Sequence, residues 1–430
     1  MVFFHSGGFM SGSGNDMLYG PDFLVENDIV LVTMNYRLGV IGFLNTGNIS
    51  APGNIGLKDQ NLALKWIQEN IINFSGCPKR VTIFGQGSGA TSVHYHMLSP
   101  MSQGLFKSAI LQSGTAVSPW AITYTPKDNA MALGEFLGLN ASNTIDLVEK
   151  LKDINGLELA AAVAGLIVTG NIGENSFVPT VESDVGQEIF LSNDPWTLIK
   201  YGDIADVPTI IGLTKDESKF MIKGLIMEAA EYQDHLCKFI PDDLNITDPV
   251  LRKEIAETFS EFYFNKEPIK QNIEALTELL GDAEYNHGPL LSARIMNSRM
   301  SSPVYEYLFN YFTSHGILKN LTEVEEGIVH CDDLVFLFHS NYLNNTPESG
   351  SNDAEITDEM VEMWTNFAKK GNPSVTMKTA KIEWEPMGED EKYLDINQNV
   401  GMKNSLFKER VTLWANLYSD ILDNYVKLFN

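Results

Sequence analysis

The sequence predicts an α/β fold with a mostly parallel central sheet that helices cover on both faces. Short runs of β-branched and aromatic residues, such as Val81–Phe84 and Pro208–Leu213, alternate with segments of helical periodicity. The first of these runs passes through the glycine-rich turn Gly85–Gly89 directly into a helix of small and apolar residues. The 430 residues are 44% hydrophobic and 20% charged, which is typical of a globular protein with a large core.

The expected elements follow the chain in order. The predicted strands are Met1–His5, Asp28–Arg37, Val81–Phe84, Lys107–Gln112, Pro208–Leu213 and Pro303–Tyr311. A helix is predicted over Leu57–Phe74, where the apolar stripe comprises Leu62, Leu64, Trp66, Ile67, Ile71 and Ile72. Mainly helical segments are expected over 127–196 and 219–300, further helices at Glu359–Lys370 and Asn404–Leu422, and a polar loop at Asn344–Glu355.

The turn at Gly85–Gly89 has the shape of a nucleophile elbow. That motif, G-x-S-x-G, holds a serine at the tip of a sharp strand-to-helix turn. In this register Gly87 stands at the tip and Ser88 follows one position late. The turn therefore leaves open whether the chain is an esterase or only has the shape of one.

The same glycines also fit a dinucleotide-binding fingerprint, because Gly85, Gly87 and Ala90 match G-x-G-x-x-A. That fingerprint requires an acidic residue about 20 positions further on to bind the ribose. No Asp or Glu occurs between Pro100 and Trp120, so we disfavour nucleotide binding.

The composition limits the kinds of partner and cofactor that the chain can be expected to bind. A formal net charge of −26 disfavours nucleic acid as a partner, because the chain would repel phosphates. Cys77, Cys237 and Cys331 are widely spaced and odd in number, so they predict neither a disulfide framework nor a zinc site. The longest apolar run, Leu159–Val168, is too short to cross a bilayer. We expect no metal, no other cofactor and no membrane span; the oligomeric state and the compartment, cytoplasmic or secreted, stay open.

A glycine pair, Gly7-Gly8, directly follows the first predicted strand in the segment His5–Phe9. Such a pair exposes backbone N–H groups without side-chain cover, as an oxyanion hole requires. An ordinary glycine turn is the alternative, and the segment alone favours that alternative.

Blocks along the whole chain resemble the type-B carboxylesterases, which include cholinesterases, insect α-esterases and juvenile hormone esterases. The blocks are MVFFHSGGF, VTMNYRLGVIGFL, APGNIGLKDQNLALKWIQENI, the elbow, LFKSAILQSG, IGLTKDE, GIVHCDDL and WTNFAKKGNP. The resemblance implies an α/β-hydrolase fold and a single domain over residues 1–430. It also implies that an N-terminal section found in family members is absent here.

The resemblance assigns roles to individual residues. Glu217, in KDES, would be the acid of a catalytic triad, and His330, in GIVHCDD, would be its base. The backbone N–H groups of Gly7, Gly8 and Ser88 would form the oxyanion hole.

Further roles follow from the same resemblance. Trp120 would line the acyl pocket, and Ser6 replaces the first of three family glycines, a change that we expect to matter little. The family's nucleophilic serine falls on Gly87. Independently of the resemblance, Ser113 and Cys331 are expected to be buried structural residues. His94 and His96 make a poor metal pair because they are two positions apart on a helix.

Glycine cannot form the acyl-enzyme, so the sequence predicts very weak or no hydrolysis of carboxylic esters. Ser88 is a poor substitute, because a shift of one residue turns its hydroxyl away from His330; a place in the first helical turn or at the cap suits it better. The alternative is a soluble, non-catalytic homologue that binds an ester, another apolar small molecule or a protein partner. Neuroligin-related family members also have glycine at this tip.

Overall fold

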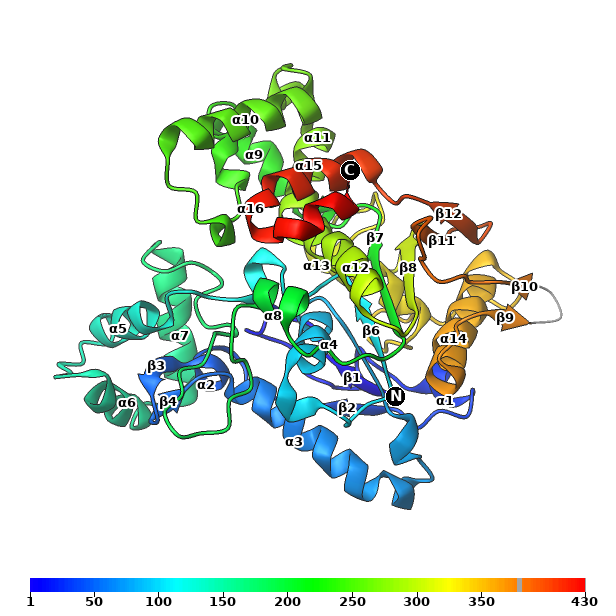
Figure 1. Cartoon of the computed structure of the whole chain (residues 1–430), viewed down its shortest axis with the longest axis horizontal. Helices are drawn as coiled ribbons and strands as arrows, with labels where there is room; N and C mark the ends of the chain where they lie inside the picture. The colour runs from blue at the N-terminus through cyan, green and yellow to red at the C-terminus, as the bar shows by residue number, and fades with distance from the viewer. Residues whose placement is uncertain (377–380, 430) are drawn as a thin grey trace.

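The computed structural model describes residues 1–376 and 381–429 and has an eight-stranded sheet at its centre (Figure 1). Its strands, in spatial order, are β12 (Gly401–Asn404), β11 (Lys392–Ile396), β8 (Val304–Phe309), β7 (Thr209–Thr214), β6 (Ser108–Gln112), β5 (Thr82–Gln86), β1 (Val2–Phe4) and β2 (Val32–Met34). The pairs are parallel except β11 with β12, which is antiparallel. Two small antiparallel pairs are β3 (Asn45–Asn48) with β4 (Ala51–Pro52), and β9 (Val375–Thr376) with β10 (Lys381–Ile382).

Helices connect these strands. The α-helices are α1 (Asp22–Val25), α2 (Gly39–Phe43), α3 (Ile55–Asn70), α4 (Ser88–Leu98), α5 (Pro126–Phe136), α6 (Thr144–Lys152), α7 (Gly156–Val168), α8 (Pro195–Tyr201), α9 (Ile222–Tyr232), α10 (Pro249–Phe264), α11 (Ile273–Gly281), α12 (His287–Arg299), α13 (Ile317–Thr322), α14 (Asn352–Lys370), α15 (Lys408–Leu417) and α16 (Ser419–Leu422). A π-helical turn, η9 (Asp282–Asn286), joins α11 to α12, and the 3₁₀ turns used below are η1 (Ile71–Phe74) and η10 (Asp332–Phe336).

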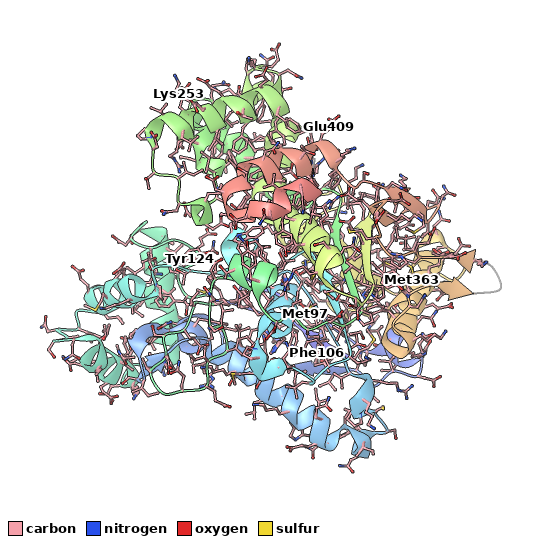
Figure 2. The ribbon with its side chains drawn as sticks, viewed as in Figure 1. Met97, Phe106, Tyr124, Lys253, Met363 and Glu409 are labelled. Carbon is pink, nitrogen blue, oxygen red and sulfur yellow. The ribbon has the colours of Figure 1, made fainter. Side chains whose placement is uncertain are left out.

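The inner strands of the sheet are buried on both faces, as the sequence predicts, while the edge strands β2 and β12 are partly exposed. Alternate residues of one strand enter different apolar clusters: in β1, Phe4 joins the cluster that contains α4 and α12, whereas Phe3 joins the one that contains α14. Ile83 and Phe84 of β5 divide in the same way. This period of two is what a pleated strand imposes. In Figure 2, Met97 of α4 lies near the middle of the molecule and Lys253 of α10 at its edge.

Helix α4 is buried along its whole length, including its polar residues. His94 accepts a hydrogen bond from the Ala116 N–H at 3.1 Å, and His96 bonds with Ser102 and Gln60. Burial lowers the pKa of each histidine to about 3, so both are neutral. In the described part of the chain, no group of three His, Cys, Asp or Glu side chains is arranged to hold a metal ion.

Several element boundaries differ from the prediction. The strand expected over Asp28–Arg37 is reduced to Val32–Met34, at the sheet edge, where it has one partner strand. Helix α14 begins at Asn352 because the Ser351 side chain caps it, so the expected loop Asn344–Glu355 is shorter. The helix expected over Asn404–Leu422 is split into α15 and α16, and Gly401–Asn404 is strand β12.

The apolar stripe predicted for Leu57–Phe74 is only half correct. Leu64, Ile67 and Ile71 are buried against the core, as the helical spacing requires. Leu62 and Ile72, however, are 67% and 68% exposed, and Trp66 is also exposed. The segment forms α3 followed by the 3₁₀ turn η1. Its apolar residues therefore lie on the solvent side as well as on the core side.

The buried carboxyl of Glu306 on β8 predicts a pH-dependent stability. Burial raises its pKa to about 7, although Arg294 of α12 lies 3.5 Å away and Glu391 binds the same arginine. The folded chain therefore holds a proton that the unfolded chain releases at about pH 4. The stability linked to this proton is complete below about pH 4 and is lost as the pH rises through about 7.

Glu306→Gln is expected to remove this contribution. The unfolding free energy of the variant, measured in urea, should fall less between pH 5 and pH 8 than that of the parent, by on the order of 2 kcal/mol. Asp332 and Glu284, whose pKa values burial also raises to about 7, remain in both proteins. Equal pH slopes in parent and variant would contradict the prediction.

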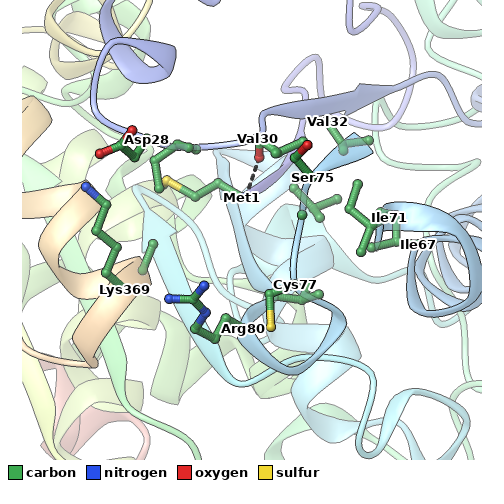
Figure 3. Close-up of a pocket in the computed structure, with 15 residues that line it drawn as sticks. Met1, Asp28, Val30, Val32, Ile67, Ile71, Ser75, Cys77, Arg80 and Lys369 are labelled. Carbon is green, nitrogen blue, oxygen red and sulfur yellow. Dashed lines mark hydrogen bonds between the residues drawn. The ribbon is translucent and has the colours of Figure 1, made fainter. Parts of the chain in front are cut away.

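A cavity of about 370 Å³ lies where β1 and β5 begin, and Figure 3 shows Met1, Cys77, Arg80 and Lys369 around it. The Met1 backbone nitrogen donates to the Val30 carbonyl at 2.8 Å. The predicted site residues follow the carboxyl ends of the strands, at the opposite edge of the sheet. Among the described residues, no helix is both long and apolar enough to cross a bilayer.

Candidate functional site

The elbow is a sharp turn between β5 and α4 that only glycine fits at its flanks. A Cβ on Gly85 would lie 2.4 Å from the Gly89 backbone, and one on Gly89 would lie 2.0 Å from the Phe4 carbonyl oxygen. Gly87, at the tip, has φ 55° and ψ −122°, a strained conformation for a residue with a side chain. Its N–H donates to the Gln112 carbonyl at 2.8 Å. The strand, turn and helix predicted from the sequence are present.

The structure brings Glu217 and His330 together. Glu217 Oε2 accepts a hydrogen bond from His330 Nδ1 at 2.5 Å, and both side chains are buried. The second carboxylate oxygen accepts from the Ser113 hydroxyl at 2.5 Å and from the Thr214 N–H at 2.7 Å. Three donors therefore fix the orientation of the carboxylate, and the carboxylate in turn orients the imidazole.

The protonation of His330 follows from its neighbours. On its other side, His330 Nε2 lies 2.9 Å from Nε2 of Gln86, an amide nitrogen that can only donate. Nε2 therefore accepts and carries no proton, while Nδ1 holds its proton toward Glu217. The Gln86 carbonyl oxygen accepts from the Cys331 thiol at 3.0 Å, which fixes the amide in this orientation. This is the tautomer that a general base requires.

Gly87 faces His330 directly. A Cβ built on Gly87 would lie 3.0 Å from His330 Nε2 and 2.7 Å from the Ser6 hydroxyl oxygen. A side chain at this tip would thus touch the His330 ring. The Ser6 hydroxyl lies close to the same point. The prediction that Ser6 matters little did not anticipate this contact.

The backbone groups predicted for an oxyanion hole lie on two segments around the tip. Gly7 and Gly8 have φ values of 125° and 61°, which favour glycine, and no described atom lies within 4 Å of a Cβ placed on Gly8. Ser88 begins α4, so the helix itself offers its N–H no acceptor. These positions leave N–H groups for an anionic oxygen.

Ser88 is the first residue of α4, which confirms the predicted place in the first helical turn. Gly87 is the N-cap, and no side chain caps this helix. The Ser88 hydroxyl is buried and, among the described residues, makes no hydrogen bond. The contacts of His330 Nε2 described above do not include this hydroxyl.

The comparisons with known proteins agree with this geometry. A model described as "Carboxylesterase family" matches residues 1–414. The chain belongs to the carboxylesterase family. A carboxylic ester hydrolase of Bombus ignitus is 33% identical over 96% of this chain and 75% of its own length. A juvenile hormone esterase of Tribolium castaneum is 33% identical over 87% of this chain and 67% of its own length.

A solved structure bears out the predicted fold of this carboxylesterase-family chain. The juvenile hormone esterase of Manduca sexta superposes with a TM-score of 0.84 at 29% identity, covering 97% of this chain and 80% of that one. The α/β-hydrolase fold and the insect-esterase resemblance are thereby confirmed.

Aromatic rings surround His330 in this carboxylesterase fold. The ring of Tyr285, on the π-helical turn η9, lies 4.8 Å from the His330 ring, and that of Phe220 lies 6.4 Å away. Trp120 lies 6.4 Å from Tyr285 and donates to the Glu284 carbonyl at 2.8 Å. Tyr285 thus lies between Trp120 and His330.

The three residues after His330 contact different parts of the protein. Asp332 pairs with Lys319 at 2.8 Å, and Asp333 accepts from Gln112 and Tyr307, each at 2.8 Å. Cys331 is buried, and burial with neighbouring carboxylates raises its thiol pKa, so it remains a thiol. The burial of Cys331 agrees with its interpretation as a packed residue.

Sequence reasoning missed Gln86, Tyr285 and the hydroxyl of Ser6. Gln86 was detectable in principle, since it stands between two glycines of the elbow. Tyr285 gave no local signal, because it comes 45 positions before His330 in the chain and meets it only through the π-helical turn. Ser113, predicted to be a buried hydrogen-bonding serine, is such a residue.

Ser113→Ala is expected to lower the unfolding free energy by about 1.5–3 kcal/mol, the range for a hydrogen bond to a charged group. The matched control is Ser108→Ala on β6, whose buried hydroxyl bonds the neutral Thr82 hydroxyl at 2.7 Å and should cost about 0.5–1.5 kcal/mol. Urea unfolding of both variants measures the difference. Equal losses of unfolding free energy in the two variants would show that the hydrogen bond from Ser113 to Glu217 is no stronger than one between neutral groups.

Proposed function

We propose that this chain is a carboxylesterase-type ester hydrolase that is disabled at the elbow, so that its hydrolysis of carboxylic esters is very weak. One observation carries the proposal: a Cβ on Gly87 would lie 3.0 Å from Nε2 of His330. A serine there would present its hydroxyl to the base, whereas glycine presents none. The substrate class is a small-molecule ester, and the chemistry requires no cofactor.

Each remaining part has a distinct role in this proposal. His330 Nε2 would take the proton of the attacking hydroxyl and later give it to the leaving alkoxide. Glu217 would stabilise the imidazolium through the Nδ1 hydrogen bond. The N–H groups of Gly7, Gly8 and Ser88 would bind the oxyanion, and Trp120 would line the acyl pocket beyond Tyr285. Loss of the serine costs on the order of 10⁶ in kcat, or roughly 8 kcal/mol.

The test is the hydrolysis of p-nitrophenyl acetate by the unmodified protein, compared with buffer. We expect a kcat far below the usual enzymatic range of about 1–10³ s⁻¹. A kcat within that range would refute a disabled elbow. A circular dichroism spectrum and a cooperative thermal transition confirm that the sample is folded.

A second candidate is a non-catalytic binder of an ester or another apolar small molecule. The hydrogen bond from Gln86 to His330 Nε2 favours it, because this contact occupies the atom that must accept a proton. The rings of Phe220 and Tyr285 would supply an apolar wall. The ether analogue of p-nitrophenyl butyrate distinguishes the candidates: saturable calorimetric binding without any ester turnover supports the binder.

A further inference from the structure

The hydroxyl of Ser6 approaches the point at which a nucleophile is missing. This oxygen lies 2.7 Å from the Cβ position of Gly87, and His330 Nε2 lies 3.0 Å from the same position. Both atoms thus border one small space at the elbow tip. Among the described residues, the Ser6 hydroxyl makes no hydrogen bond, although it is only partly exposed. It is therefore free to donate its proton elsewhere.

The backbone of Ser6 is held firmly beside the sheet. Its carbonyl oxygen accepts from His5 Nδ1 at 2.8 Å, and the His5 carbonyl accepts from the Tyr36 hydroxyl at 2.9 Å. Gly7 and Gly8, which carry two of the proposed oxyanion donors, follow Ser6 directly in the chain. A hydroxyl in this position lies next to the groups that would bind the ester carbonyl.

We propose that Ser6 Oγ is the nucleophile of the residual hydrolysis, a step that rests on the proposed function. His330 Nε2 takes the Ser6 hydroxyl proton as Oγ bonds to the ester carbonyl carbon. The carbon–oxygen bond to the leaving group then breaks, and His330 returns the proton to the departing alkoxide. Water attacks acyl-Ser6, gives a proton to His330 and releases the acid, and His330 restores the Ser6 hydroxyl.

The same geometry explains why this route is slow. The Gln86 amide must leave His330 Nε2 before that atom can accept a proton from Ser6. Ser6 also approaches from the loop after β1 and not from the elbow, so its alignment with the carbonyl differs from that of a serine at the tip. Misplacement of about 1 Å is enough to reduce such a reaction about 10²-fold.

A fluorophosphonate probe tests the proposal, because attack by a hydroxyl forms a stable oxygen–phosphorus bond and releases fluoride. The full chain, Ser6→Ala, Ser6→Cys and the control Ser13→Ala, an exposed serine of the same loop, are each treated with the probe. Peptide mass spectrometry then locates the adduct. We expect slow labelling of Ser6 in the parent and in Ser13→Ala, and complete loss of the label in Ser6→Ala.

Ester turnover gives the second readout. Residual hydrolysis of p-nitrophenyl acetate should fall to the buffer rate in Ser6→Ala and persist in Ser13→Ala, while Ser6→Cys should accumulate an acyl-thioester at this residue. An adduct on Ser88, or residual turnover unchanged in Ser6→Ala, overturns the role of Ser6. If the folded parent is neither labelled nor able to hydrolyse the ester, Ser6 is not a nucleophile, but the proposal of a disabled elbow is unaffected. If the parent hydrolyses the ester rapidly, the proposed function itself is wrong.

Discussion

Gly87→Ser is expected to raise kcat/KM for a short-chain p-nitrophenyl ester by several decades. In the proposed function His330 is the base and Glu217 the acid: His330 Nε2 lies 3.0 Å from the Cβ position of residue 87, and Nδ1 bonds to Glu217. The contribution of a triad serine, on the order of 10⁶ in kcat, is the upper limit of the expected gain. Because the new Cβ would lie 2.7 Å from the Ser6 hydroxyl, that side chain must rotate; the double variant Ser6→Gly/Gly87→Ser removes the contact and should be at least as active.

The same substitution should destabilise the protein. A side chain at φ 55° and ψ −122° costs about 1–3 kcal/mol, so activity and stability are expected to change in opposite directions. Gly87→Ala is the matched control: it brings the same backbone strain without a hydroxyl, and should lose stability without gaining activity. If Gly87→Ser folds but is no faster than Gly87→Ala, residue 87 is not the position of the nucleophile.

In the Gly87→Ser background, Glu217→Gln is expected to lower kcat by about 10⁴, as the loss of the acid charge does in a serine protease triad. The reason is the 2.5 Å hydrogen bond from His330 Nδ1, which an amide nitrogen at the same place could not accept. Glu217 accepts hydrogen bonds at both carboxylate oxygens, whereas glutamine has only one oxygen to offer. Steady-state hydrolysis of p-nitrophenyl acetate measures the loss.

The control for this variant is Glu274→Gln in the same background. Glu274 is 69% exposed and pairs with Lys219, so it should leave kcat unchanged. A loss below about tenfold for Glu217→Gln would mean that the imidazole does not depend on this carboxylate, and the triad assignment would fail.

The inner strands β1, β5, β6 and β7 were predictable because they are buried on both faces and therefore form nearly continuous apolar runs. Strand β6 begins one residue after the predicted start, and β7 is displaced by one residue at each end. Strands β11 and β12 were missed, since both are short, Lys392–Ile396 contains two charged residues, and Gly401–Asn404 has only one apolar side chain. The predicted apolar stripe wrongly included exposed residues of α3, such as Leu62, because periodicity does not reveal which face of a helix meets the core.

The site was predictable where family motifs fix the local backbone. Glu217, His330 and Gly87 are separated widely in the sequence, and the motif order alone brought them to one site. The contacts that decide their chemistry were not accessible in this way. The Gln86 amide reaches His330, and the Ser6 hydroxyl reaches the elbow tip, only through the packing of β5 against β1 and the loop before η10.

The most direct test of the central claim is to identify the residue that a fluorophosphonate modifies in the Gly87→Ser variant. The claim is that Gly87 occupies the nucleophile position of an otherwise assembled catalytic site. We predict rapid, stoichiometric labelling of the substituted residue 87, and loss of that labelling in Gly87→Ser/His330→Ala. A folded Gly87→Ser protein that stays unlabelled at residue 87, or that is labelled there equally well without His330, would contradict it.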